Sequence, residues 1–227
     1  MKILYLETSS KNCSVAISDN EKLLCVTEEV SENYKQSESL HTFVEWALEG
    51  AGISIKEIEA VCLGKGPGSY TGLRIGAASA KGFCYGLKIP LIAVNSMESI
   101  IEPFLDQNYD LIIPLIDARR MEVYTAVYDG KTGKEISATE AKILDETSFE
   151  EFKDKKVVFA GDGAKKAEEV LQLPDATFDD TIYPSAKYLI KKAIEKIDQK
   201  EFEDIAYFEP FYLKDFHGVK KKNKSEE

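Results

Sequence analysis

Apolar runs separated by short polar turns predict three strands within the first thirty residues. These strands span residues 2–7, 12–18 and 22–30. Turn-forming residues at 8–11 and 19–20 separate them. The chain is therefore expected to open with two successive hairpins.

After Gln36 the spacing of apolar residues changes to that of an amphipathic helix. Its stripe is followed by two glycines that are expected to end it: Leu40, Phe43, Val44, Ala47, Leu48 and Ala51, with Gly50 and Gly52. A strand up to Leu63, a helix over 72–87, a strand over 89–94 and a helix capped by Ser96 come next. Strands that alternate with helices in this way are typical of a layered α/β fold.

The second half of the chain repeats this order after a polar break between residues 103 and 110. A strand over 111–116, an alternating segment from Val123 and a third strand-like segment after the turn at 129–133 predict another meander. A second set of segments completes the half: a strand over 157–160, a glycine-bearing turn at 161–163, a helix over 164–171 and a helix over 183–197.

Two α/β lobes, each with a βββαβα core, are the expected organisation. The first lobe spans residues 1–105 and carries the helices expected at a dimer contact, and the second spans residues 106–214. Residues 215–227, with the run KKKNKSEE, have almost no apolar side chains and predict a disordered, charged tail.

A glycine-rich segment, LGKGPGSYTGLRIGAASAKGFCYGL, covers residues 63–87. It joins an apolar strand to a helix, and glycines there allow another backbone or a ligand to come close. Neither a Walker A loop nor a dinucleotide fingerprint fits its spacing. Two interpretations stay open: the segment contacts a phosphate through backbone N–H groups, or it is a plain strand-to-helix connection.

Charge and cysteine content narrow the functional classes. The 227 residues carry a formal net charge of −11, with 29 Lys and Arg against 40 Asp and Glu. Unaided binding to nucleic acid is disfavoured, because such binding depends on Lys and Arg that neutralise phosphates. The four cysteines form no CxxC pair and are expected to be small buried hydrophobes in a reducing compartment. Neither a signal peptide nor a membrane span is expected, so the predicted location is the cytoplasm.

Five segments together resemble the bacterial TsaB (YeaZ) family in order and spacing. They cover residues 1 to about 214: ILYLETSSKNCSVAI, QSESLH, LGKGPGSYTGLRIGAASAKGFCYGLKIPLIAV, DARRMEVY and EPFYL. The resemblance implies the duplicated fold of the actin, Hsp70 and sugar-kinase superfamily of ATPases, in agreement with the two-lobe prediction. It also implies a role in placing the N6-threonylcarbamoyl group on adenosine 37 of tRNA.

The same resemblance implies a non-catalytic, dimerising subunit. Its partners would be a TsaD-type paralogue that carries the transfer chemistry and a TsaE-type ATPase. A homodimer is expected when the protein is alone, and tRNA would be reached indirectly through the complex. No intrinsic cofactor is expected, although ATP or ADP is a candidate ligand of the complex.

Nucleotide contacts are the rival hypothesis, in which the chain is a small kinase or ATP hydrolase that uses a cleft between the lobes. Its candidate contacts lie at the first hairpin and at two glycine-bearing turns: Glu7, Thr8, Ser9, Gly66, Gly68, Asp117, Gly161 and Gly163. Family members usually begin with Asp-Thr-Ser, so Glu7 moves the carboxylate by one methylene and weakens a claim of ATPase geometry. Thr8 and Ser9 are also ordinary turn formers.

No catalytic residue and no metal site is assigned. His41 and His217 are the two histidines, and the positions four residues from His41 are Ser37 and Glu45. A single imidazole with one glutamate is a poor site for a transition metal. Ser69 lies in a glycine-rich turn, but its neighbours do not form a nucleophile elbow.

A partner surface is the favoured interpretation of the helix over 72–87. The helix carries small residues on nearly every side, and two apolar stripes run along it. This pattern predicts that the helix is buried on two sides. Trp46 lies off the core stripe of the preceding helix, and tryptophan is enriched at interface hot spots. The predicted contact residues are His41, Trp46, Leu73, Ile75, Ser79, Ala80, Gly82 and Phe83.

Overall fold

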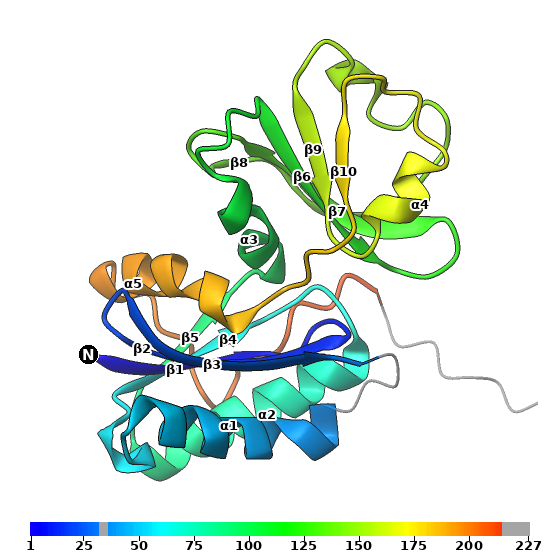
Figure 1. Ribbon diagram of the computed structural model, residues 1–227. Helices are drawn as coiled ribbons and strands as arrows, with labels where there is room; N and C mark the ends of the chain where they lie inside the picture. The colour runs from blue at the N-terminus through cyan, green and yellow to red at the C-terminus, as the bar shows by residue number, and fades with distance from the viewer. Residues whose placement is uncertain (32–35, 215–227) are drawn as a thin grey trace, which may run out of the picture.

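Two five-stranded sheets with the same strand order form the two lobes of the computed structural model, which describes residues 1–31 and 36–214 (Figure 1). The first sheet has the order β3-β2-β1-β4-β5, with β1 at Lys2–Glu7, β2 at Asn12–Asp19, β3 at Lys22–Val30, β4 at Ala60–Gly64 and β5 at Leu91–Val94. The second has the order β8-β7-β6-β9-β10, with β6 at Leu111–Asp117, β7 at Glu122–Asp129, β8 at Glu135–Ile143, β9 at Val157–Ala160 and β10 at Thr177–Asp179.

Strand direction follows the same plan in both sheets. β1 pairs antiparallel with β2 and parallel with β4, and β6 pairs antiparallel with β7 and parallel with β9. This internal repeat is the duplicated architecture of the actin-like ATPase superfamily, and the predicted fold class is confirmed. Beyond the predicted βββαβα core each lobe carries a fifth strand, of which β5 was predicted over residues 89–94 and β10 was not.

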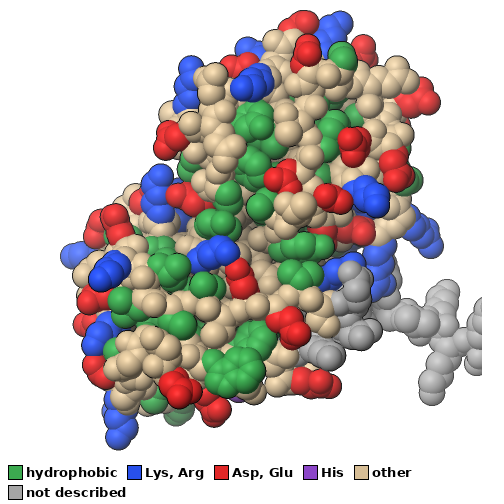
Figure 2. All heavy atoms as spheres, viewed as in Figure 1, with side chains coloured by type: hydrophobic (Ala, Val, Ile, Leu, Met, Phe, Trp, Pro, Cys, Tyr) green, Lys and Arg blue, Asp and Glu red, His purple; other side chains and the backbone are tan. Residues whose placement is uncertain are grey.

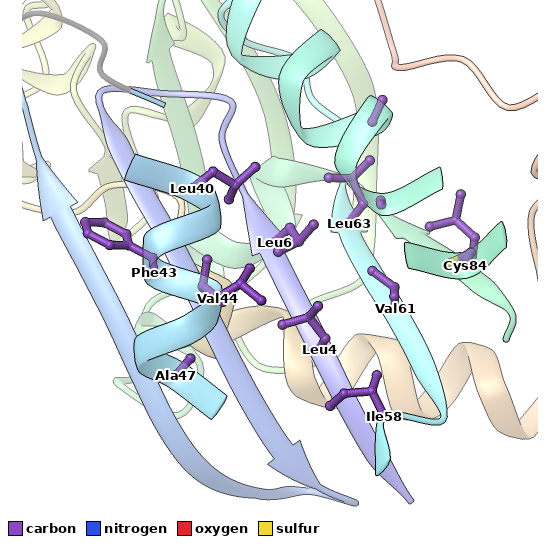
Figure 3. Close-up of a cluster of buried hydrophobic side chains, with 14 of the residues drawn as sticks. Leu4, Leu6, Leu40, Phe43, Val44, Ala47, Ile58, Val61, Leu63 and Cys84 are labelled. Carbon is purple, nitrogen blue, oxygen red and sulfur yellow. The ribbon is translucent and has the colours of Figure 1, made fainter. Parts of the chain in front are cut away.

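Helices α1 (Gln36–Ala51) and α2 (Tyr70–Leu87) cover one face of the first sheet (Figure 1). Their inward stripes meet alternate residues of the strands, and Leu40 and Val44 of α1 pack with Leu6 of β1 in the core shown in Figure 3. Apolar burial of this kind stabilises the lobe by roughly 1.5–3 kcal/mol per large side chain.

Two helices cross the junction between the lobes. Helix α3 (Ser96–Ile101) follows the strands of the first sheet, yet its residues Met97 and Ile100 belong to a core cluster of the second sheet. Helix α5 (Ile190–Asp198) follows the strands of the second sheet, yet Ile190 and Ala193 pack on the first. A boundary at residue 105 therefore separates the strands of the two lobes but does not separate their helical layers.

The second lobe has less helix than the first. Its helix α4 spans Ala164–Glu168, and the helical connection between its third and fourth strands is the 3-10 turn η3 (Glu150–Phe152). The other 3-10 turns are η1 (Ile55–Glu57), η2 (Glu102–Phe104) and η4 (Ala186–Leu189). A cis peptide bond joins Gly66 to Pro67.

Several predicted boundaries need correction. Asn95 caps α3 through its side chain, whereas the predicted cap Ser96 is the first helical residue. The predicted helix over 183–197 begins as η4 at Ala186, because residues before it run as an irregular connection from the second lobe. Strand β10 was not predicted, and the predicted tail at 215–227 lies outside the described residues.

The cysteines are all free, and three of them are buried while Cys25 is partly exposed. Within residues 1–31 and 36–214, no helix is long and apolar enough to cross a membrane.

Candidate functional site

The outer face of α1 and α2 exposes large hydrophobic side chains. Trp46 of α1 is 54% exposed and Tyr85 of α2 is 83% exposed. Trp46 stacks on the buried ring of Phe43, with 5.6 Å between ring centroids, so its position is fixed although it faces solvent. Hydrophobic side chains reach the surface at the lower edge of the first lobe in Figure 2, on the side where Figure 1 places α1.

His41 of α1 contacts two residues of α2 at this face. Its Nε2 lies 3.2 Å from the Ser79 hydroxyl, and its ring lies 5.9 Å from that of Phe83. His41 is exposed, while Ser79 and Phe83 are partly buried. We call the surface made by His41, Trp46, Ser79, Gly82, Phe83, Tyr85 and Gly86 the docking face.

The glycines of α2 divide into two groups. Gly72 and Gly76 are pressed against Thr8, and a Cβ at either position would overlap an oxygen of that residue. Gly82 and Gly86 face open space, where an added Cβ would meet nothing within 4 Å. The packing of this chain therefore accounts for the glycines at the start of α2 but not for those near its end.

The predicted partner contacts at Leu73 and Ala80 are wrong for the surface of this chain. Leu73 is 1% exposed and Ala80 is 0% exposed, because both lie on the side of α2 that covers the first sheet. Ile75 packs partly against the same core. The other predicted contact residues lie on the docking face. Tyr85 and Gly86 were missed, although they follow Ala78 and Gly82 at helical spacing.

A buried carboxylate lies at the end of β1. The Glu7 side chain accepts a hydrogen bond from the Ser9 backbone N–H at 2.7 Å and one from the Ser96 hydroxyl at 2.9 Å. Ser96 in turn accepts the backbone N–H of Gly66 at 3.1 Å. Burial raises the pKa of Glu7, and the hydrogen bonds from Ser9 and Ser96 oppose that rise.

This arrangement corrects the predicted phosphate contacts of the first lobe. Glu7 and Thr8 are fully buried and Ser9 is 1% exposed, so none of them presents a surface to a ligand. The glycine-rich segment covers them: Ser69 donates its N–H to the Ser9 carbonyl, and the Thr8 hydroxyl donates to the Gly72 carbonyl at 2.8 Å. Gly66 is buried as well.

The candidate residues of the second lobe lie around a second polar group. Gly161 and Gly163 are buried against the Leu115 backbone, so their predicted phosphate contact is also corrected. Asp117 is exposed and pairs with Lys166 at 2.6 Å, while its N–H donates to Asp162 at 2.8 Å. Phosphate contact at Gly68 and Asp117 stays a prediction.

Asp162 lies where the two lobes come close to each other. Burial raises the pKa of its carboxyl, and the charges of Lys11 and Lys166 oppose this rise. Lys11 belongs to the β1–β2 turn of the first lobe. The β1–β2 and β6–β7 turns, which occupy equivalent places in the repeat, therefore face the same junction.

A metal centre has no support among the described residues. No three His, Cys, Asp or Glu side chains of residues 1–31 and 36–214 come together in a way that could hold a metal ion. His217 lies outside that part of the chain.

Sequence and structure comparisons both find relatives among proteins of tRNA threonylcarbamoyladenosine biosynthesis. Residues 28–216 match the family model described as TsaD, tRNA N6-adenosine threonylcarbamoyltransferase. The tRNA threonylcarbamoyladenosine biosynthesis protein TsaB of Bacillus subtilis is 30% identical over 167 residues, which cover 71% of each chain. TsaB of Haemophilus influenzae is 23% identical over 224 residues, covering 94% of each. YeaZ from Pseudomonas aeruginosa superimposes with a TM-score of 0.80 at 27% identity, covering 93% of this chain and 99% of that one.

Proposed function

Because the chain belongs to the TsaB family of tRNA threonylcarbamoyladenosine biosynthesis proteins, we propose that it is a non-catalytic subunit of the complex that modifies adenosine 37 of tRNA. In this role it binds a TsaD-type catalytic paralogue and holds it in its active form. The process takes place on tRNA and so in the cytoplasm.

The observation that carries this proposal is the pair of glycines, Gly82 and Gly86, on the docking face. A glycine inside a helix costs about 0.5–1 kcal/mol relative to alanine. Nothing in the described chain approaches either residue closely enough to explain that cost. A helix from another polypeptide, packed against α2 at short distance, supplies the missing reason.

The aromatic residues that α1 and α2 present at the surface fit the same interpretation. Trp46, Phe83 and Tyr85 are the kinds of side chain that contribute most to protein interfaces. Trp46 is held by Phe43 before any partner arrives, so little conformational entropy is lost on binding. The same face, presented by two copies related by a twofold axis, forms the homodimer proposed for the protein alone.

The paralogue and the homodimer compete for one surface in this proposal. A paralogue with an equivalent α1–α2 pair offers a pseudo-symmetric surface to the docking face. A TsaE-type ATPase then joins the heterodimer, and ATP or ADP binds in the assembled complex rather than to this chain alone.

Reconstitution tests the function directly. The chain, its TsaD-type and TsaE-type partners from the same organism, unmodified tRNA and the small substrates are combined, and modified adenosine is measured by mass spectrometry. Omission of the chain should abolish the product. Undiminished product without it would overturn the proposal.

A pair of variants tests the docking face. Phe83→Glu places a charge between the two helices and should prevent both homodimerisation and binding to the paralogue, as seen by light scattering. Ile136→Glu is the matched control, because Ile136 is 59% exposed on β8 of the other lobe. Equal assembly of Phe83→Glu and wild type would contradict the assignment of this face.

The kinase or hydrolase hypothesis is disfavoured by the burial of Glu7 and Thr8, which it needs at the phosphates. Incubation of the chain alone with ATP and magnesium should give no turnover above background. Turnover that disappears on mutation of Asp117 would revive that hypothesis.

A further inference from the structure

Two neighbouring arginines stand out in a chain that otherwise uses lysine. Of the 29 basic residues, Arg74, Arg119 and Arg120 are the arginines. Arg74 lies over the ring of Tyr70, with 4.4 Å from its guanidinium carbon to the ring centroid. Arg119 and Arg120 are both exposed, in the turn between β6 and β7.

The backbone of this turn is unfavourable for arginine. Arg119 has φ of 70° and Arg120 has φ of 53°, a left-handed conformation that glycine and asparagine adopt at lower cost. Glycine or asparagine would form the same turn at lower cost. A residue that holds such a strained backbone conformation often has a functional role. The guanidinium groups, rather than the turn, are the candidates for that function.

Contacts around the turn fix its backbone and leave those two groups free. The Arg119 N–H donates to Asp117 Oδ1 at 2.7 Å, and Lys166 Nζ donates to the Arg120 carbonyl at 2.9 Å. Within residues 1–31 and 36–214, neither guanidinium makes a hydrogen bond or an ion pair. By contrast, the nearby Lys166 pairs with Asp117 and Lys214 pairs with Glu122.

The position of the turn suits a ligand that spans both lobes. It lies beside Asp162, on which the charge of Lys11 from the first lobe also acts. Lys and Arg side chains, interspersed with Asp and Glu, lie at this end of the second lobe beside the junction with the first (Figure 2). Asp117, Glu122 and Asp162 lie in the same region, but Lys166 and Lys214 pair with the first two, so these lysines offset acidic charge that would otherwise act on the arginines.

We propose that Arg119 and Arg120 bind backbone phosphates of the tRNA substrate directly. Arginine presents a planar, bidentate donor that matches a phosphate, whereas lysine acts as a point charge. This inference rests on the proposed function, and it gives this subunit its own contact with tRNA in place of the purely indirect contact expected from composition. The docking face on α1 and α2 stays available for the catalytic paralogue.

The test uses the full chain in its complex with the TsaD-type and TsaE-type partners. The variant Arg119→Asn with Arg120→Gly removes both guanidinium groups and places residues that tolerate the left-handed backbone. Binding of fluorescently labelled, unmodified tRNA is measured by anisotropy at several salt concentrations. We expect about tenfold weaker binding at low salt and a salt slope shallower by about two, one unit for each lost phosphate contact.

A matched control removes the same charge from the other end of the same sheet. Lys153→Asn with Lys155→Gly changes two exposed lysines shortly before β9, whose Val157 pairs with Leu111 at the start of β6, whereas the arginine turn follows its end. This control should bind tRNA as wild type does. Arg119→Lys with Arg120→Lys should restore the salt slope but only part of the affinity.

The remaining outcomes are separable. Unchanged tRNA affinity of the Asn/Gly variant would overturn the proposal, and so would lost assembly with the protein partners, which would make the turn a protein contact. A higher KM for ATP with an unchanged KM for tRNA would also overturn it. A wild-type complex that modifies tRNA equally well without this chain refutes the proposed function instead.

Discussion

Glu7 lies directly over Gly64, so closely that a Cβ at residue 64 would overlap the Glu7 carboxylate. Gly64 ends β4, the strand that pairs parallel with β1, and the missing side chain leaves room for a carboxylate that reaches Ser96 Oγ at 2.9 Å. Ser96 begins α3, which packs on the second sheet. Glu7 thus connects the first hairpin to a helix at the junction of the lobes.

The contact between these residues predicts a coupled pair of mutations. Gly64→Ala should destabilise the protein by about 1–3 kcal/mol, because the methyl group displaces the carboxylate. Glu7→Asp alone should also destabilise the protein, because the shorter side chain loses the hydrogen bond from the Ser96 hydroxyl. The double variant should be less unstable than the sum of the two, as measured by urea denaturation. Strict additivity would contradict the contact.

Burial of Glu7 predicts how stability depends on pH. Its pKa is raised in the folded state, so ionisation of Glu7 opposes folding. Its contribution is therefore most favourable at low pH and is lost as pH rises through the folded-state pKa. Glu7→Gln should therefore gain stability relative to wild type as pH rises above the ordinary pKa of a glutamate, measured by denaturant midpoints at a series of pH values. A difference that is the same below that pKa and at neutral pH would argue against a perturbed Glu7.

Strand positions and the repeat of two lobes could be predicted from the sequence, because turns and apolar periodicity are local. β1 and β3 have the predicted bounds, and the apolar run 157–160 is β9. The crossing of α3 and α5 could not be predicted, because it depends on which sheet each helix meets. The outward side of Gly82 and the burial of Glu7 likewise depend on residues distant in sequence.

The phosphate contacts predicted at residues that turn out to be buried were misplaced for the same reason, whereas those at Gly68 and Asp117 stay predictions. Glycines after a strand allow either a ligand or another backbone segment to come close. The sequence alone does not distinguish these two possibilities. In the structure the glycines of this segment make room for the first hairpin: Gly68 lies against Ser9, and Gly72 and Gly76 lie against Thr8. Leu73 and Ala80 were misplaced because α2 is apolar on two sides, and only the fold shows which stripe covers the sheet.

The contribution of Glu28 to stability should depend on pH in the opposite sense to that of Glu7. Burial alone would raise its pKa, but hydrogen bonds from Lys187 and Ser185, the Lys187 charge and a bond from Ser14 lower it overall. Its contribution to stability is therefore present at neutral pH and is lost as pH falls through its folded-state pKa. Glu28→Gln should be less stable than wild type at pH 7 and approach it on acidification, as followed by thermal unfolding.

The two groups of glycines in α2 predict opposite effects of alanine. Gly82→Ala and Gly86→Ala should each stabilise the isolated chain by about 0.5–1 kcal/mol, because alanine favours the helix and meets no neighbour. Gly76→Ala should destabilise it by about 1–3 kcal/mol, because its Cβ would overlap the Thr8 hydroxyl. The decisive measurement combines chemical denaturation, at concentrations where light scattering shows the chain to be monomeric, with titration of the TsaD-type partner. If a partner helix packs against Gly82 and Gly86, the variants that stabilise the monomer should weaken the complex. Variants that raise both stability and affinity would show that these glycines do not lie at the contact.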